Sequence, residues 1–382
     1  MRPRASLPII ALLLTATLLA VACSGSTGEE VSADEARAPD QPGAISGTAA
    51  AVAAFGTDLY RSLASRNANL VVSPYAVAEG LATTRAGADG DTAAQIDVVL
   101  HADRAERYGL DAGFNAIGLE LDGRSGQRES DLRKGKVDLE LATAAWAQKG
   151  NRFRDEYLTT LARYYGTGMR VVDFRSDPEA ARKAVNSWAS EETRGHISEL
   201  VPRGVLTQST RYLLTSALYL RAPWQIGFRV EQTRQLPFHL LDGQTITTPT
   251  LVGREQKAYS YGKGDGWEAV GLPYLGGQLD MIIVLPAAGT MADFEAALDG
   301  DRLATITRSL NFAPLEVQLP KFQFTTELEL DDTLAALGMP VAFSPDDADL
   351  SGITADEPLW IGGDLHQSYI SVDEEGTEAS AA

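Results

Sequence analysis

The stretch Ser371-Val372-Asp373-Glu374-Glu375-Gly376-Thr377-Glu378-Ala379-Ser380-Ala381-Ala382 decides how this chain folds. It continues from Ser368-Tyr369-Ile370, where aromatic and β-branched residues predict a strand. If residues 377–382 also form a strand, their side chains alternate between two faces. One face carries Thr377, Ala379 and Ala381, and the other carries Glu378, Ser380 and Ala382. The first face is small and nearly apolar, so such a strand fits between existing strands without a clash. We expect the charged face to meet solvent.

Gly376 stands immediately before this potential strand. Glycine tolerates backbone dihedrals that other residues avoid, so it predicts a hinge at this point. The same composition is also typical of a disordered tail rich in Ala, Ser and Glu, because chain ends usually fray.

The overall composition is that of a globular protein. The chain has 382 residues, of which 44% are apolar and 22% are charged. Its net charge is -19 and its pI is about 4.6. Such an acidic surface repels phosphate backbones, so we expect no nucleic-acid partner.

The N-terminus predicts a leader segment that is removed. Arg2 and Arg4 form a basic head, and residues 7–21 form an apolar run too short to span a bilayer comfortably. The sequence Ala20-Val21-Ala22-Cys23 is similar to a bacterial lipobox. We therefore expect residues 1–22 to be a signal peptide and Cys23 to become a lipidated N-terminus that partners a membrane.

The segment 23–47 is rich in small and acidic residues, which predicts a lipid-anchored flexible linker. The protein would then be secreted or at the cell surface, as a lipid-anchored bacterial lipoprotein. Ordinary secretion with cleavage nearby is the alternative. Cys23 is the sole cysteine, so it cannot form an internal disulfide.

The sequence contains no motif of a known catalytic or metal centre that we recognise. It lacks Gly-x-Ser-x-Gly and His-Glu-x-x-His, and the spacing of its four histidines fits no metal site. Residues 347–352 begin like a calcium loop, but Pro358 occupies the twelfth position, where glutamate is needed. We therefore expect no enzyme, no metal and no cofactor, and an unrelated surface hydrolase is the least supported alternative.

Local patterns predict a mixture of helices and strands without strict alternation. Apolar periodicity and capping signals predict helices over residues 49–63, 74–86, 92–100, 110–121, 153–165, 178–193, 292–298 and 330–337. Strands are predicted over residues 69–72, 137–148, 169–174, 211–220, 237–240, 245–252, 267–272, 315–324 and 368–372.

Several motifs resemble the serpin family, in the order in which that family carries them. They are Ser73-Pro74 with Gly87-Ala88 and Thr92, Val185-Asn186-Ser187-Trp188 with Thr193, Gly195 and Ile197, Ser216 to Trp224, Leu272-Pro273-Tyr274 with Leu279 to Pro286, Leu319-Pro320-Lys321-Phe322, Ala342-Phe343-Ser344 with Leu350 to Ile353, and Asp373 to Ala379. The resemblance runs from about residue 49 to the last residue.

This resemblance implies a single α+β serpin domain over residues 48–382. It would hold three β-sheets surrounded by about eight or nine helices. It also implies that the sequence is truncated after the reactive-loop hinge, so that the C-terminal strands of the fold are missing.

The resemblance further implies a serine-type endopeptidase inhibitor that acts as a suicide substrate. A target serine protease would cut a loop beyond Ala382, and the hinge would then insert into the main sheet as a strand. The hinge residues are Glu374, Glu375, Gly376, Thr377, Glu378, Ala379, Ser380, Ala381 and Ala382. We expect a monomer. The alternatives are an inhibitor of cysteine proteases and a non-inhibitory surface binding protein of the same fold.

The family pattern also implies roles for residues outside the hinge. Ser73, Ser216 and His366 would form a hydrogen-bonded region where the sheet opens, and Trp224 would cover the top of the sheet. Ser216 stands where the family usually has Asn, and a hydroxyl offers fewer hydrogen bonds than an amide. His366 and Trp224 could also be ordinary core residues.

Lys321 and Glu374 would form an ion pair that holds the hinge. If exposed, such a pair contributes only about 0–1 kcal/mol.

Overall fold

The computed structural model describes residues 28–64, 68–131, 133–256 and 259–381, so Cys23 and Ala382 lie outside the described residues. Its α-helices are α1 (Ile45–Ala64), α2 (Pro74–Arg85), α3 (Gly90–Val99), α4 (Leu110–Asp122), α5 (Asp155–Thr160), α6 (Pro178–Glu192), α7 (Met291–Ala296), α8 (Gly300–Ser309) and α9 (Asp331–Leu337). Shorter helical turns are η1 (Pro42–Ala44), η2 (Ala102–Ala105), the π-helical η3 (Leu161–Tyr165), η4 (Val230–Gln232) and η5 (Pro340–Phe343).

The strands of the described residues form three sheets. The main sheet has the order β1-β4-β3-β5-β15-β14-β13, with β2 beside β3. These strands are β1 (Glu29–Val31), β2 (Gly126–Glu129), β3 (Lys134–Gln148), β4 (Met169–Val172), β5 (Tyr212–Pro223), β13 (Phe322–Glu329), β14 (Leu365–Val372) and β15 (Gly376–Ala381).

The two smaller sheets have the orders β10-β9-β8-β11 and β12-β7-β6. Their strands are β6 (Arg234–His239), β7 (Thr245–Gln256), β8 (Ser260–Gly264), β9 (Trp267–Pro273), β10 (Asp280–Pro286), β11 (Asn311–Phe312) and β12 (Leu315–Pro320). A mixed α+β fold with three sheets is therefore confirmed, with nine α-helices in the part of the chain that the structure describes.

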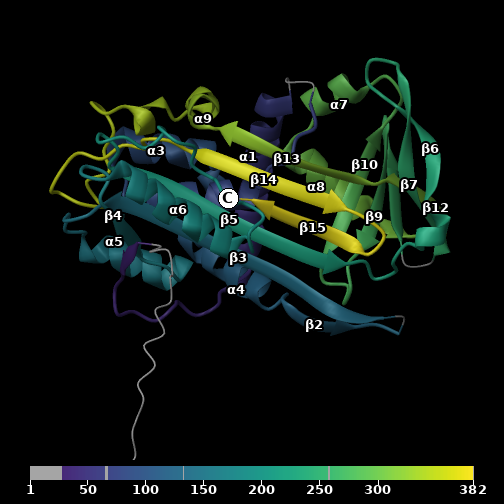
Figure 1. Ribbon diagram of the computed structural model, residues 1–382, viewed down its shortest axis with the longest axis horizontal. Coiled ribbons are helices and arrows are strands. Elements are labelled where there is room, and N and C mark those ends of the chain that lie inside the picture. Colours follow the sequence, from purple (N-terminus) through teal and green to yellow (C-terminus); the bar gives the residue numbers. More distant parts are fainter. Residues whose placement is uncertain (1–27, 65–67, 132, 257–258, 382) are drawn as a thin grey trace, which may run out of the picture.

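The last strand, β15, lies in the middle of the main sheet between β5 and β14, and α6 crosses the face of the sheet nearest the viewer (Figure 1). β14 and β15 are antiparallel and joined by a short turn. Just past the end of β15, Leu214 and Asp364 form a direct bridge that joins β5 to the residue before β14. The gap that β15 fills is therefore closed below it.

Apolar side chains cover both faces of the main sheet. On one face a large core joins the sheet to α1, α2, α3 and α9, and includes Phe55, Leu81 and Ile96. On the other face α6 packs through Trp188, whose ring meets that of Trp146 edge-on at 6.0 Å. A third core, around Trp224, lies beneath the turn between β14 and β15.

Two local predictions are wrong, and one helix was not predicted. Residues 69–72 form no strand, because Val71 donates its backbone N–H to the Thr326 hydroxyl and not to a neighbouring strand. The predicted strand over residues 315–324 is two strands, since β12 and β13 belong to different sheets on either side of Lys321. The helix α8 was missed, although Asp299 caps it by accepting the backbone N–H of Arg302.

The predicted linker over residues 23–47 is wrong for its described part, residues 28–47. β1 pairs with β4 and extends the main sheet, and α1 begins at Ile45. Ala38 is buried and donates its N–H to the Arg163 carbonyl, 2.7 Å away. Small and acidic residues predicted flexibility here, but backbone pairing along a sheet edge places few demands on side chains.

The expectation that C-terminal strands are missing finds no support in the structure. The chain's last two strands, β14 and β15, are present, and each pairs with a neighbour on both sides.

The attachment of the N-terminal segment depends on Asn115 of α4. Its buried amide donates to the carbonyls of Ala38 and Pro39 and accepts from Arg37 Nε at 3.0 Å. We predict that Asn115→Ala lowers the free energy of unfolding by about 2 kcal/mol, since it leaves buried groups unpaired. Urea denaturation measures this.

Asp122→Asn is the matched control, because exposed Asp122 contacts the same arginine at 3.4 Å. It should lower the free energy of unfolding by only about 0–1 kcal/mol. An equally small loss of unfolding free energy in Asn115→Ala would show that the N-terminal segment adds little stability.

Candidate functional site

The candidate site is β15 together with the turn that leads into it. Thr377 pairs with Ala222 of β5 and with Val372 of β14, and the register continues to Ala381 opposite Leu218 and Ser368. Strand β15 is therefore hydrogen-bonded on both edges. The family resemblance implies that these residues become a strand after a loop is cut, whereas the structure places residues 376–381 within the sheet.

The two faces of β15 only partly match the prediction. On the predicted apolar face Thr377 and Ala381 are buried, and Thr377 Oγ1 accepts a 2.8 Å hydrogen bond from the Tyr274 hydroxyl. The other face was expected to meet solvent, but Ser380 is 1% exposed and Glu378 is half-buried. This expectation is wrong because residues that follow α6 cover that face.

The turn between β14 and β15 is organised by Asp373. Its carboxylate accepts the backbone N–H groups of Glu375 at 2.8 Å and Gly376 at 3.2 Å. A Cβ on Gly376 would lie 2.3 Å from the Ala222 carbonyl oxygen. Gly376 is thus required by its close approach to β5, and its backbone is not in the left-handed conformation that would favour glycine.

Glu374 is held by two side chains beside the turn. Lys321 Nζ lies 2.6 Å from one carboxylate oxygen, and the Thr233 hydroxyl donates to the other at 2.6 Å. Burial alone would raise the pKa of Glu374, but these hydrogen bonds outweigh it and hold the pKa below its usual value. Glu374 is 7% exposed, so the contact is less screened than the sequence suggested.

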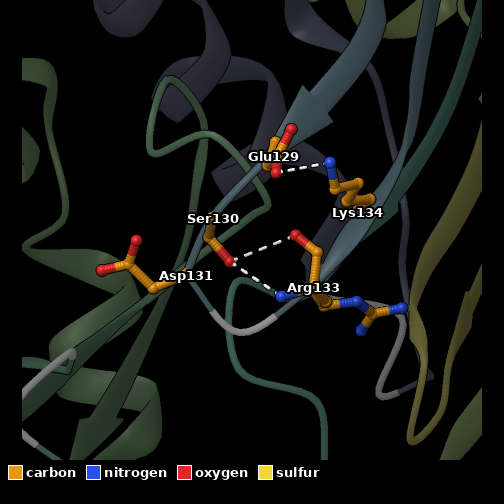
Figure 2. A pocket seen from close by; sticks show the side chains of 5 residues that line it. All are labelled: Glu129, Ser130, Asp131, Arg133 and Lys134. Carbon is orange, nitrogen blue, oxygen red and sulfur yellow. Dashed lines mark hydrogen bonds and ion pairs between the residues drawn. The ribbon is translucent and has the colours of Figure 1, made fainter.

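A second cation reaches the turn from the β2–β3 hairpin. Arg133 donates to the Glu375 carboxylate at 2.9 Å and to the Trp224 carbonyl at 3.3 Å. Figure 2 shows that its guanidinium points away from Ser130, whose hydroxyl bonds the Arg133 backbone. Lys134 pairs with Glu129 in the same hairpin. The pocket drawn there is lined by balanced charges from one hairpin, and we assign it no role.

Trp224 lies at the same turn. Its ring stacks on Tyr274 with centroids 4.8 Å apart and planes 8° apart. Its Nε1 donates to the Asp373 carbonyl at 2.9 Å. Its backbone N–H donates to the Glu375 carbonyl, also at 2.9 Å. The tryptophan therefore holds the entry point of β15 in place.

His366 lies near the lower end of β15 and is 2% exposed. Its Nε2 receives the Ser73 backbone N–H at 3.1 Å and lies 2.8 Å from the Ser368 hydroxyl. Since an N–H can only donate, Nε2 carries no proton and the Ser368 hydroxyl donates to it as well. Burial lowers the pKa of His366 to about 4, so the ring is neutral at physiological pH.

The structure brings only part of the predicted sheet-opening set together. Ser73 bonds His366 through its backbone and caps α2 through its hydroxyl. Ser216 is buried on β5, but among the described residues no hydrogen bond joins it to His366. Ser368, which does bond the ring, was missed, although its spacing of two places it on the same face of β14 as His366.

Other residues of the site were missed as well. Thr233, Arg133 and Tyr274 come from three separate parts of the chain, and no local pattern marks them as partners of the hinge. In the described part of the chain, no cluster of His, Cys, Asp and Glu could hold a metal ion. Nor does any described helix have the length and apolar character needed to cross a bilayer.

The fold and site define a class of protein whose main sheet contains a strand, β15, supplied by the segment that follows β14. The family model described as "Serpin (serine protease inhibitor)" matches residues 50–382, and the chain belongs to the serpin family.

Individual comparisons agree. The chain is 34% identical to the leukocyte elastase inhibitor of Bos taurus, over 86% of each chain. It is similar to the solved structure titled "Cleaved Serpin 42Da", with a TM-score of 0.77, 28% identity and 89% coverage of both chains. The fold also matches ovalbumin of the emu, Dromaius novaehollandiae, with a TM-score of 0.80, 24% identity and coverage of 87% and 88%.

Two buried groups at the lower end of β15 give opposite pH dependences. Burial and the charge of Asp331 raise the pKa of Asp364 from 3.8 to about 7, so its stabilising contribution is lost as pH rises from 3.8 to 7. The pKa of His366 falls from 6.5 to about 4, so its contribution is lost as pH falls from 6.5 to 4.

We predict that Asp364→Asn makes the protein less stable, relative to wild type, at pH 4 than at pH 7, and that His366→Asn does the reverse. Each difference should reach a few kcal/mol, at about 1.4 kcal/mol per pKa unit. Urea titrations across this pH range measure it. Differences of the same sign in both variants would contradict this assignment.

The close approach of Gly376 to β5 gives a further prediction. Gly376→Ala should lower the free energy of unfolding by about 1–3 kcal/mol, because the added Cβ meets backbone that must shift. Gly363→Ala is the control, since a Cβ there would meet nothing within 4 Å. Thermal unfolding of both variants measures the effect, and equal losses would refute the steric reason.

Proposed function

We propose that this protein inhibits a serine protease as a suicide substrate, by inserting its reactive loop into the main sheet. The observation that carries the proposal is the position of β15, paired with β5 on one edge and with β14 on the other. A family match described as a serine protease inhibitor and a relative named as an elastase inhibitor support inhibition of proteases in general.

In this mechanism the protease attacks a loop on the C-terminal side of β15 and becomes covalently attached to it as an acyl-enzyme. Once the loop is cut, the hinge is free to enter the sheet. Insertion adds backbone hydrogen bonds on two edges and buries Thr377 and Ala381. The attached protease moves with the strand, and its active site is deformed. In this mechanism the catalytic groups belong to the protease.

The hinge contacts fit the starting point of this movement. Trp224, Lys321 and Arg133 bind the backbone or carboxylates of residues 373–375 at the top of the sheet. They fix where the strand enters, and Gly376 allows it to lie against β5.

The location of the protein is part of the proposal. We propose cleavage of residues 1–22, lipidation of Cys23 and display on a bacterial cell surface as a monomer. The apolar run before the lipobox-like Ala20-Val21-Ala22-Cys23 supports this.

Cys23→Ser would release the protein from the membrane fraction, and unchanged membrane retention would refute the anchor.

The central test of function uses the whole protein encoded by the reading frame that contains residues 1–382. It is expressed without residues 1–22. The protein is mixed with trypsin-like, chymotrypsin-like and subtilisin-like serine proteases, and with a papain-like cysteine protease. A complex with a serine protease that survives denaturing gel electrophoresis supports the proposal. A complex with the cysteine protease alone would change the target class. Clean loop cutting without a complex would indicate a non-inhibitory binding protein.

We predict that Thr377→Arg converts the inhibitor into a substrate. Thr377 is 4% exposed, so an arginine there would place an unpaired charge inside the sheet and slow insertion. The measurement is the ratio of covalent complex to cut protein on denaturing gels, which should fall at least about tenfold.

Thr377→Val is the matched control, since it keeps the size of the side chain and adds no charge. It loses only the hydrogen bond from Tyr274 and should still form the complex. Unchanged inhibition by Thr377→Arg would count against β15 as the inserting strand.

A further inference from the structure

The turn that follows α6 makes side-chain contacts with four adjacent strands of the main sheet. Arg194 pairs with Glu140 and lies 3.2 Å from Asp138, both on β3, and its guanidinium lies 4.8 Å from the centre of the Tyr219 ring on β5. His196 contacts β5, β15 and β14. The turn therefore spans the sheet at the level of β15.

His196 lies across β15. Its ring stacks on Tyr219 of β5, with centroids 5.7 Å apart, and on Tyr369 of β14, with centroids 5.1 Å apart. These two tyrosines are the register partners of Ser380 on either side. An imidazole that contacts both rings bridges the strand between them, which explains why Ser380 is 1% exposed.

Glu378 of β15 is the charged partner beneath this turn. His196 Nε2 lies 3.1 Å from its carboxylate, and the Tyr219 hydroxyl donates to the same oxygen at 2.7 Å. In an exposed loop this carboxylate would be fully hydrated, whereas in the sheet its side chain is 33% exposed. Burying part of a carboxylate costs free energy unless other groups replace the lost water. His196 and Tyr219 are placed to do so.

The backbone fixes the turn in this position. Arg194 and Gly195 both have positive φ angles, of 52° and 84°. The buried Thr193 hydroxyl accepts the N–H of Ile197 at 3.0 Å, and Gly195 N–H donates to the Ser190 carbonyl at 2.7 Å. The turn is thus tied to α6 on one side, and its side chains face the strands on the other.

We propose that residues 193–197 are a latch that recognises the inserted strand through Glu378, with His196 and Tyr219 as positioning residues. This rests on the proposed function, because it takes β15 as the inserting strand. The charged and titratable groups that face His196 are Glu378 on β15, Tyr219 and Arg221 on β5, Tyr369 on β14, Asp138 and Glu140 on β3, and Arg194 on its own turn. Only Glu378 arrives with the inserted strand.

The test measures hydrogen–deuterium exchange of the β15 amides in the full chain, after a protease that it does not inhibit has cut the loop and has been removed. We compare wild type, His196→Gln, Glu378→Gln and the double variant at one pH. His196→Gln should speed β15 exchange about threefold, because it removes the ring whose Nε2 lies 3.1 Å from the Glu378 carboxylate. In the Glu378→Gln background the effect should vanish. Tyr219→Phe should also speed exchange, because it removes the hydroxyl that donates to Glu378.

His101→Gln is the matched control, because His101 pairs with Asp58 of α1 at 2.8 Å with similar exposure and lies away from β15. It should leave β15 exchange unchanged. If His196→Gln leaves β15 exchange unchanged, or acts equally in the Glu378→Gln background, the latch is refuted. If β15 lacks protection even in the cut wild-type protein, the proposed insertion itself fails, so the two failures are distinguishable.

Discussion

The pairing of β15 with both of its neighbours is the constraint on which the rest of this structure depends. Backbone N–H and C=O groups inside a sheet must be paired, and β5 and β14 can satisfy theirs beside β15 or directly with each other. The structure contains both arrangements: β15 separates the two strands at the top, and Leu214 meets Asp364 below. Many polar contacts described above lie along this division.

The contacts at the turn and the contacts at the centre of the sheet involve different residues, those before β15 and those within it. Lys321, Arg133 and Trp224 hold residues 373–375, which precede β15 and lie outside the sheet's centre. Tyr274 and His196 contact opposite faces of β15 itself, at Thr377 and Glu378. In the proposed mechanism, the first set would position the entry of the strand, whereas the second would form after entry.

Much of the fold could be predicted because its signals are local. Ser73 and Pro74 predict the start of α2, and the period-two pattern of residues 377–381 correctly placed Thr377 and Ala381 on one buried face. Lys321 and Glu374 were named together only through the family resemblance. The partners that sequence reasoning missed, such as Thr233 and Arg133, come from distant loops whose positions depend on tertiary packing.

The errors have related causes. Residues 28–47 looked flexible because their side chains are small and polar, but β1 is attached through its backbone to the edge of the sheet. Gly376 was interpreted as a source of backbone freedom, whereas the structure shows that the neighbouring carbonyl leaves no space for a side chain. Amino-acid composition indicates which backbone conformations a segment can adopt. It does not indicate which other strand will pack against that segment.

The bridge between Leu214 and Asp364 closes the gap between β5 and β14 just below β15. A residue that extended β15 downward would first have to separate β5 from the segment before β14, which meet at this bridge. It would then pair with both strands, in place of the single direct contact between them. In the proposed insertion, residues would therefore enter in order from the top, and each would open the space for the next.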